Sequence, residues 1–143
     1  MIDVLQKLGL RATPQRLAIL ALLEGNTSHP SAEEIYAQLK PRFPSLSLAT
    51  VYNTLEALAR GGVLQEIDID PERRRFDPNP APHCHFRCLR CGRVFDWPGV
   101  PPETPRPEDA AGFLIQRASV HLYGLCPDCA PPGNKAPDGD KED

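Results

Sequence analysis

SLATVYNTLEALARGGVLQEIDIDPERRRFD, which occupies residues 47–77, contains two hydrophobic periods in succession. Apolar side chains recur at helical spacing, three and four residues apart, at Leu48, Val51, Leu55 and Leu58. We therefore expect a helix over residues 47–60, which Ser47 caps and a glycine pair ends. Alternating apolar and polar residues over 63–69, a turn, and a returning segment at 74–77 then predict a β-hairpin.

Three more helices are predicted upstream of this stretch. The first covers residues 3–10. The second begins at Thr13-Pro14, a capping residue followed by proline at the first helical position. The third begins at the capping box of Ser31 and Glu34 and ends before Pro41. Helices followed by a hairpin with arginines at its tip indicate a winged helix-turn-helix domain over residues 1–78.

The rest of the chain is predicted to form a smaller domain, which makes the fold class α+β. A proline-rich hinge at 79–82 leads into a C-terminal α/β domain at 83–130. Strands are expected at 85–88, 93–97 and 113–125. Five prolines in residues 98–107 leave room for at most a short helix at 108–111, and the acidic tail at 131–143 is expected to be disordered.

The composition is typical of a globular protein that stays in the cytoplasm. Of the 143 residues, 41% are hydrophobic and 24% are charged, and no apolar run approaches the roughly 18 residues of a membrane span. The N-terminus lacks the features of a signal peptide. We therefore expect a reducing environment, in which cysteines bind metal more often than they form disulfides. The net charge of −3 restricts any DNA-binding surface to a local basic patch.

Two CxxC motifs, Cys88–Cys91 and Cys126–Cys129, are separated by 34 residues. Each motif presents two sulfurs from one turn, and together they complete a tetrahedral S₄ shell that suits structural Zn²⁺. Two independent redox motifs or buried thiols are the alternatives. Cys84 is left over, either as an ordinary small residue or as a redox-active thiol.

A second metal site is suggested by the pair His83-x-His85, which strand alternation places on one face. Alone, such a pair on a strand is more often simply polar surface. Asp77, Asp96 and His29 are further candidates, and three imidazoles with two carboxylates suit Fe²⁺ or Mn²⁺, although zinc also fits such a set.

Five segments together resemble the ferric uptake regulator (Fur) family. They are LRATPQR, HPSAEEIY, FPSLSLATVYNTLEALARGGVL, HCHFRCLRCGRVFD and LYGLCPDC, and the resemblance extends over residues 8–130. It implies that the C-terminal domain mediates dimerisation. It also implies that the regulatory metal site of the family consists of His29, Asp77, His83, His85 and Asp96.

Within the family, the chain is similar to the peroxide-responsive members called PerR, because aspartate stands at positions 77 and 96. A further metal site of many Fur proteins is expected to be absent, since Pro82, Cys84 and Arg117-Ala118 replace its ligands. His121 is interpreted as a surface residue. The prolines of residues 98–107 depart from the family pattern, so the resemblance does not define the details of the dimer surface.

A palindromic double-stranded DNA operator is the expected partner of a homodimer of this kind. The helix at 47–60 would enter the major groove, with the wing on the backbone or in the minor groove. The residues expected to contact DNA are Arg11, Arg16, Thr50, Tyr52, Asn53, Arg73, Arg74 and Arg75. For the arginines, a solvated turn is the alternative interpretation.

The sequence thus predicts a metal-dependent repressor rather than an enzyme, with no small-molecule substrate. The resemblance to PerR implies that peroxide releases it from DNA through oxidation of His29 or His83 at bound Fe²⁺. An Fe²⁺- or Mn²⁺-uptake regulator without peroxide sensing is the nearest alternative. A metal hydrolase and a zinc-stabilised interaction module are more distant ones.

Overall fold

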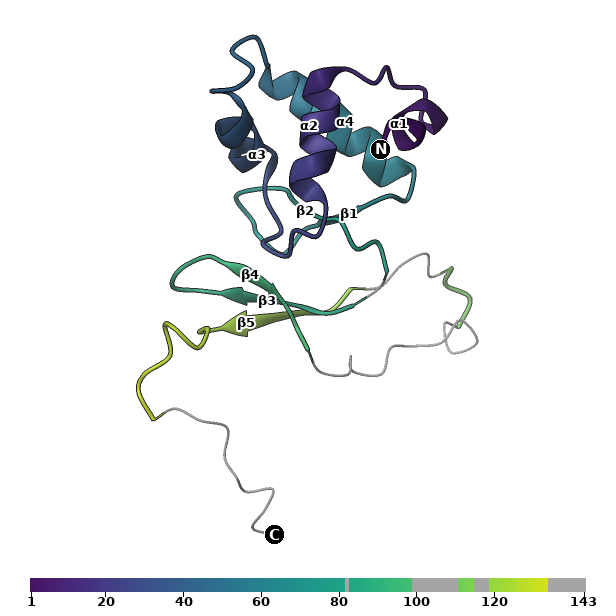
Figure 1. Cartoon of the computed structure of the whole chain (residues 1–143). Coiled ribbons are helices and arrows are strands. Elements are labelled where there is room, and N and C mark those ends of the chain that lie inside the picture. The colour runs from purple at the N-terminus through teal and green to yellow at the C-terminus, as the bar shows by residue number, and fades with distance from the viewer. Residues whose placement is uncertain (82, 99–110, 115–118, 134–143) are drawn as a thin grey trace.

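The computed structural model describes residues 1–81, 83–98, 111–114 and 119–133. Four helices and a two-stranded hairpin form an N-terminal part, and a three-stranded sheet lies beneath the hairpin (Figure 1). None of the helices in these ranges is long and apolar enough to cross a membrane.

Three of the four helices begin where the sequence predicts, because the capping residues Thr13, Ser31 and Ser47 make their expected bonds. They are α1 (Ile2–Lys7), α2 (Pro14–Leu23), α3 (Ala32–Leu39) and α4 (Leu48–Arg60). The side chains of Thr13 and Ser47 accept hydrogen bonds from the third residue of α2 and α4, and Ser31 with Glu34 forms the predicted capping box. Only α1 is shorter than predicted, since the chain turns at Gly9 with φ of 74°.

The main hydrophobic core lies between the four helices and the hairpin. Its fully buried members include Leu5, Ile19, Ile35, Val51, Leu55, Leu58 and Phe76. The predicted inward face of α4 is confirmed at Val51, Leu55 and Leu58, whereas Leu48 is half-buried. Thr54 is buried as well, because its hydroxyl donates to the carbonyl of Thr50 within the helix.

The predicted hairpin forms, with shorter strands than expected. β1 (Gln65–Ile67) pairs antiparallel with β2 (Arg75–Asp77), with Glu66 opposite Phe76. The ladder ends early because the Asp70 carboxylate accepts hydrogen bonds from the Glu72 amide and the Arg75 side chain. These two bonds turn the chain before the strands reach the tip.

The second sheet has the strand order β4-β3-β5. β3 (His85–Cys88) is antiparallel to β4 (Val94–Asp96) and parallel to β5 (His121–Gly124). The predicted long strand at 113–125 is wrong at its start: Phe113 and Leu114 are irregular and exposed, and residues 115–118 lie outside the described residues.

Other expectations for the C-terminal half fall largely on residues that the structure does not describe. The proline-rich segment after Pro98 and the short helix before Ala111 are among them. So are residue 82 of the hinge and residues 134–143 of the tail, although 131–133 are described and include a turn.

The hairpin and the second sheet meet through a small apolar cluster of Ile67, Ile69 and Val94. Beside it, His121 Nε2 lies 2.8 Å from a carboxylate oxygen of Asp68. The expectation that His121 is a surface residue is therefore corrected, because its side chain is only 16% exposed and contacts the hairpin.

Candidate metal centres

Four separate segments bring His29, Asp77, His83, His85 and Asp96 together. His29 precedes α3, Asp77 ends β2, His83 lies just before β3, which His85 begins, and Asp96 ends β4. One ligand atom from each lies within 4.8 Å of all the others. The first two belong to the helical part and the last three to the second sheet, so this cluster joins the two parts of the molecule.

The two carboxylates lie between the three imidazoles. Asp77 Oδ2 is 3.3, 2.8 and 2.9 Å from the Nε2 atoms of His29, His83 and His85. Asp96 Oδ1 is 2.8, 2.8 and 3.6 Å from the same three atoms. Ligands bound to one ion at about 2.0–2.2 Å cannot lie much more than about 4.4 Å apart, and the cluster is close to that size.

Backbone carbonyls fix the orientation of two of the imidazoles. His29 Nδ1 lies 3.1 Å from the carbonyl oxygen of Val94, and His83 Nδ1 lies 2.7 Å from that of Ala81. A carbonyl can only accept, so each Nδ1 carries the proton and a neutral ring presents its Nε2 lone pair to the carboxylates. Lone pairs that face carboxylate oxygens require a positive charge between them, either a proton or a metal ion.

The pKa values of the cluster reflect this need for a positive charge between the imidazoles and the carboxylates. Burial disfavours a charged imidazole at His29, but hydrogen bonds to Asp77 and Asp96 outweigh it and raise its pKa. Burial likewise opposes the charge of His83, and the Ala81 carbonyl and Asp96 raise its pKa. Burial also opposes ionisation of Asp77, yet the bonds to His29 and His85 hold its pKa well below the usual range. The cluster thus favours an ionised Asp77 together with a cation.

The donor set fits a divalent transition metal. Three imidazole nitrogens and two carboxylate oxygens suit Fe²⁺ or Mn²⁺, and zinc also accepts such ligands. The hydrogen bonds at Nδ1 of His29 and His83 are the outer-shell contacts that metal-binding histidines normally make. His29, Asp77 and His85 are buried, which keeps water away from most of the cluster.

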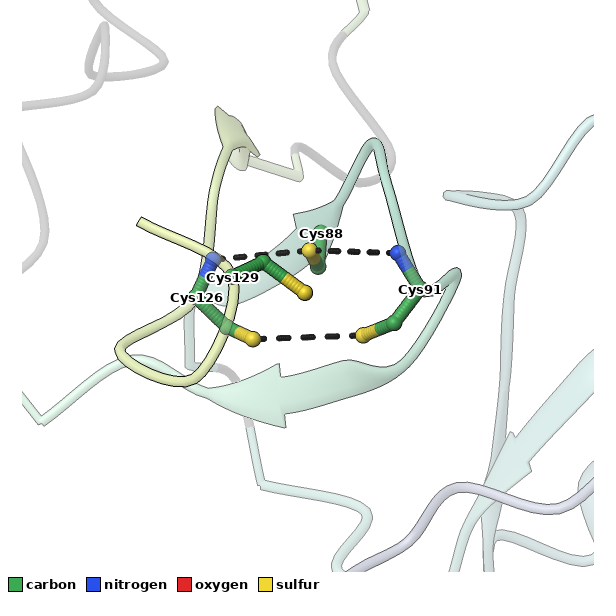
Figure 2. A group of neighbouring side chains, drawn as sticks. All are labelled: Cys88, Cys91, Cys126 and Cys129. Atoms are coloured by element: carbon green, nitrogen blue, oxygen red, sulfur yellow. Dashed lines mark hydrogen bonds between the residues drawn. The ribbon is translucent and has the colours of Figure 1, made fainter. Parts of the chain in front are cut away.

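The four cysteines of the CxxC motifs form a second cluster, at the far end of β3 (Figure 2). The amide nitrogens of Cys91 and Cys126 both donate to Cys88 Sγ, each over 3.4 Å. Cys91 Sγ and Cys126 Sγ are 3.9 Å apart, too far for a disulfide and close to the edge of about 3.8 Å expected for a zinc–thiolate tetrahedron. The two independent redox motifs considered above do not fit this convergence.

The thiol pKa values also favour a bound cation. The backbone amide of Cys91 is the main cause that lowers the pKa of Cys88 to about 5. The Arg93 side chain lowers the pKa of Cys91, because its Nε–H donates to that sulfur over 3.3 Å. Burial and the neighbouring sulfurs raise the pKa of Cys129 to about 12, so four thiolates cannot coexist here without a compensating ion.

The residues expected to contact DNA fall into different environments. Asn53 and Arg11 are exposed, and Thr50 is half-buried. The hydroxyl of Tyr52 donates to Glu33 of α3 over 2.6 Å. Arg16 is half-buried and donates to the carbonyl oxygen of Arg11 over 3.0 Å. Of these residues, Asn53 and Arg11 present the most accessible side chains.

The three wing arginines do not form a single basic patch. Arg73 is half-exposed and lies 3.9 Å from Glu34. Arg74 pairs with Glu56 of α4 at 3.0 Å and with Glu66 of β1 at 2.7 Å. Arg75 requires a correction: its side chain is 8% exposed and its guanidinium points into the protein, so it cannot reach a DNA phosphate from this position.

Arg75 instead connects four parts of the molecule. Its guanidinium donates to Asp70 in the wing turn over 3.1 Å and to the carbonyl oxygen of His29 over 3.1 Å. It also contacts Glu34 of α3 at 3.4 Å and the carbonyl of Gly92 at 3.5 Å. The sequence contained a signal for this role. Residues 75 and 77 lie on the same face of β2, so Arg75 shares the face of the metal-site residue Asp77.

Comparison with known proteins identifies the family to which this fold belongs. The model of the ferric uptake regulator family matches residues 7–123. The chain belongs to this family. The peroxide-responsive repressor PerR of Staphylococcus epidermidis is 36% identical over 132 residues, which cover 91% of this chain and 88% of that protein. The mixed helix-and-sheet fold predicted from the sequence is confirmed.

Solved Fur-family structures agree with this assignment. The peroxide stress regulator of Campylobacter jejuni is 32% identical, with a TM-score of 0.60 over 90% of this chain and 98% of that one. The ferric uptake regulator of Vibrio cholerae is 29% identical, with a TM-score of 0.65 over 87% and 98%. The likeness therefore extends to members of the Fur family with different names.

Proposed function

We propose that this Fur-family protein is a metal-dependent, DNA-binding transcriptional repressor that responds to peroxide. The observation that carries the proposal is the cluster of His29, Asp77, His83, His85 and Asp96, which draws ligands from both parts of the molecule. The similarity to repressors named PerR supports the peroxide response. A repressor of this kind acts on DNA in the cytoplasm.

The five residues of the cluster would hold Fe²⁺ or Mn²⁺. When bound, Fe²⁺ supplies the electrons that reduce a peroxide, a reactivity that Mn²⁺ lacks. The imidazoles of His29 and His83, which their Nδ1 bonds to Val94 and Ala81 hold at the cluster, are the rings that the similarity to PerR suggests as targets of oxidation. An oxidised ring no longer offers the same nitrogen, and the two parts of the molecule lose that connection.

Regulation follows from the position of the ligands. Binding of one ion by all five ligands would fix the second sheet against the hairpin and α3. It would thereby fix the angle at which α4 is presented to DNA. Without the ion, the protein samples arrangements of its two parts that match the DNA poorly. DNA binding must then select the matching arrangement, and the free energy that this costs lowers the affinity for DNA. Metal and DNA should therefore strengthen each other's binding reciprocally.

The domains would divide the work as follows. Residues 1–78 bind DNA, with Thr50, Tyr52 and Asn53 of α4 toward the major groove and Arg11, Arg16, Arg73 and Arg74 near the backbone. Residues 83–130 form the dimerisation domain, which Zn²⁺ on Cys88, Cys91, Cys126 and Cys129 stabilises. A two-fold dimer presents two copies of α4, so its operator is palindromic.

A direct test uses a duplex selected from a random pool by the Mn²⁺-loaded protein. Mn²⁺ should raise the affinity for this duplex, and Asp96→Ala should reduce that gain by about tenfold or more, within the usual range of coupling between sites. Asp3→Ala, which changes an exposed aspartate of α1, is the control and should behave like the wild type. Unchanged Mn²⁺ stimulation in Asp96→Ala would refute the proposal.

Peroxide sensing has its own test, which also separates the nearest alternative. The similarity to the Vibrio cholerae ferric uptake regulator favours an uptake regulator on the same scaffold. Peroxide should release the Fe²⁺-loaded protein from DNA and add one oxygen atom to the peptide that contains His29 or His83. The Mn²⁺-loaded protein should show neither change. If the Fe²⁺-loaded protein stayed on DNA with both peptides unoxidised, the result would favour the uptake regulator.

A further inference from the structure

A polar cavity of about 460 Å³ lies beside the cysteine cluster and apart from the His/Asp cluster, between α3, the wing turn and the turn that joins β3 to β4. Five arginines are among the residues that line it: Arg73, Arg75, Arg87, Arg90 and Arg93. The first two belong to the helical part of the molecule and the other three to the second sheet. The cavity is therefore a basic junction between the two parts.

Carboxylates in the lining neutralise only part of this charge. The acidic residues that contribute are Glu34, Asp70 and Glu72. Asp70 forms an ion pair with Arg75 at 3.1 Å, and both side chains are buried. Glu34 lies 3.4 Å from Arg75 and only 3.9 Å from Arg73. Arg93 is also engaged, because it pairs with Asp128 at 2.8 Å and donates to Cys91 Sγ over 3.3 Å. The positive charge that remains available in the lining is therefore that of Arg87 and Arg90.

Two of the arginines lack a fixed partner in the part of the chain that the structure describes. Arg87 Nε is buried and has no hydrogen-bond partner there, although the guanidinium lies close enough to Asp70 to lower the pKa of that carboxyl. Arg90 is exposed and forms no ion pair with any described residue. A buried N–H donor without a partner is unfavourable, so this site is incomplete without an acceptor.

We propose that this cavity binds a small phosphate-type oxyanion, free in solution, as a second ligand of the protein. Planar guanidinium groups recognise such anions with paired hydrogen bonds. An anion held by Arg87 and Arg90 and by Arg73 would bridge the two parts of the molecule. It would lie beside Arg75, which donates to the carbonyl of His29, and so would reinforce the arrangement that the metal cluster closes. This inference goes beyond the proposed function.

The DNA backbone is the other source of phosphate, but the cavity does not fit it as well. None of the α4 residues expected to face DNA, Thr50, Tyr52 and Asn53, lines the cavity. The zinc cluster instead contributes Cys91 together with its neighbour Gly92. A free anion can enter from this side while α4 faces the duplex.

Calorimetric titration of the zinc-loaded protein with inorganic phosphate and with pyrophosphate, at constant ionic strength and without DNA, tests the proposal. One anion should bind per chain, and Arg87→Gln should weaken binding by about tenfold or more. Arg90→Gln should weaken it as well, and because Arg90 is exposed this variant retains the fold. Arg60→Gln, an exposed arginine at the end of α4, is the matched control and should bind as the wild type does.

The outcomes are distinguishable. Zinc content and circular dichroism of each variant show whether a loss of binding is merely a loss of fold. Absence of phosphate and pyrophosphate binding to the wild type, or equal binding by wild type, Arg87→Gln and Arg90→Gln, would overturn the proposal. It would also be overturned if free anions did not bind while both variants weakened duplex binding and its salt dependence, because the DNA backbone would then be the ligand.

Discussion

His29 is the residue on which the two parts of the molecule depend most. Its side chain is fully buried, and its φ of 55° lies in the left-handed region that a residue with a Cβ seldom adopts. Such a conformation costs about 1–3 kcal/mol, so the surrounding contacts must hold it in place. Those contacts are the Val94 carbonyl at Nδ1 and Arg75 at the backbone oxygen.

The titration of His29 and His83 predicts opposite effects of pH on the metal-free and metal-loaded protein. Their pKa values are raised in the metal-free fold, so their contribution to stability is present below the unfolded value of about 6.5 and is lost as pH rises through the folded pKa. As pH rises above about 6.5, the unfolding temperature of the metal-free protein should therefore fall. Affinity for Mn²⁺ should rise over the same range, since the metal displaces those protons.

Asp77→Asn provides the comparison for this pH dependence. It removes the ionised carboxylate that helps to raise the pKa of His29, so the fall in unfolding temperature should become shallower. Thermal unfolding followed by circular dichroism across the pH series measures both slopes. Equal slopes in the wild type and Asp77→Asn would contradict the explanation.

Single residues were predictable from the sequence to different degrees. All five residues of the His/Asp cluster converge as proposed, but His83-x-His85 alone could not identify His29 or Asp77, which lie on other elements. The sequence offered both as further candidates, and the resemblance to a family assigned them to one site. Arg75 was assigned to the wing surface because three consecutive arginines resemble a basic tip, and strand alternation turns the third one inward.

Among the elements, the turn after β3 and the segment after β5 depend on the cysteine cluster. Cys126→Ser should abolish zinc binding and reduce the free energy of unfolding by more than about 4 kcal/mol, a loss expected when a structural metal is removed. Cys84→Ala is the matched control, because Cys84 is a buried thiol outside the cluster. It should retain one zinc ion and lose only about 1 kcal/mol.

Zinc analysis and denaturant unfolding of the two cysteine variants measure these effects. If Cys126→Ser kept its zinc, or if both variants were equally stable, the four-thiolate site would not be the element that supports this part of the chain.

Local signals predicted the helices better than the strands. Caps at Thr13, Ser31 and Ser47 are short-range features that sequence contains in full, and each helix begins beside its cap. Strand ends depend on partners far away in the chain. β5 begins only at His121 because its partner β3 is four residues long, although apolar residues extend upstream to Phe113.

For the whole molecule, Arg75 is the contact that unites the wing, α3, the metal cluster and the zinc turn. Arg75→Met should lower the free energy of unfolding by about 3–5 kcal/mol, because it leaves the buried Asp70 carboxylate without its partner. More Mn²⁺ should then be needed to reach half-maximal duplex binding. Arg73→Met is the matched control and should cost no more than about 0.5 kcal/mol, since Arg73 is half-exposed.

The double variant Asp70→Leu with Arg75→Met separates the lost ion pair from other effects. It should recover part of the stability that Arg75→Met loses, because no buried charge then remains unpaired. Chemical denaturation of the four proteins yields the coupling energy. A coupling near zero would mean that the loss of the Asp70–Arg75 ion pair does not explain the destabilisation by Arg75→Met.

The shared strand β3 has a physiological consequence. His85 begins it and Cys88 ends it, so about 10 Å of one extended backbone separates a residue of the oxidant-sensitive cluster from one of the thiolates. In a cell depleted of zinc, β3 would no longer be anchored at Cys88, and the imidazole of His85 at its other end would be misplaced. Zinc starvation should therefore blunt the oxidative-stress response even when iron is plentiful.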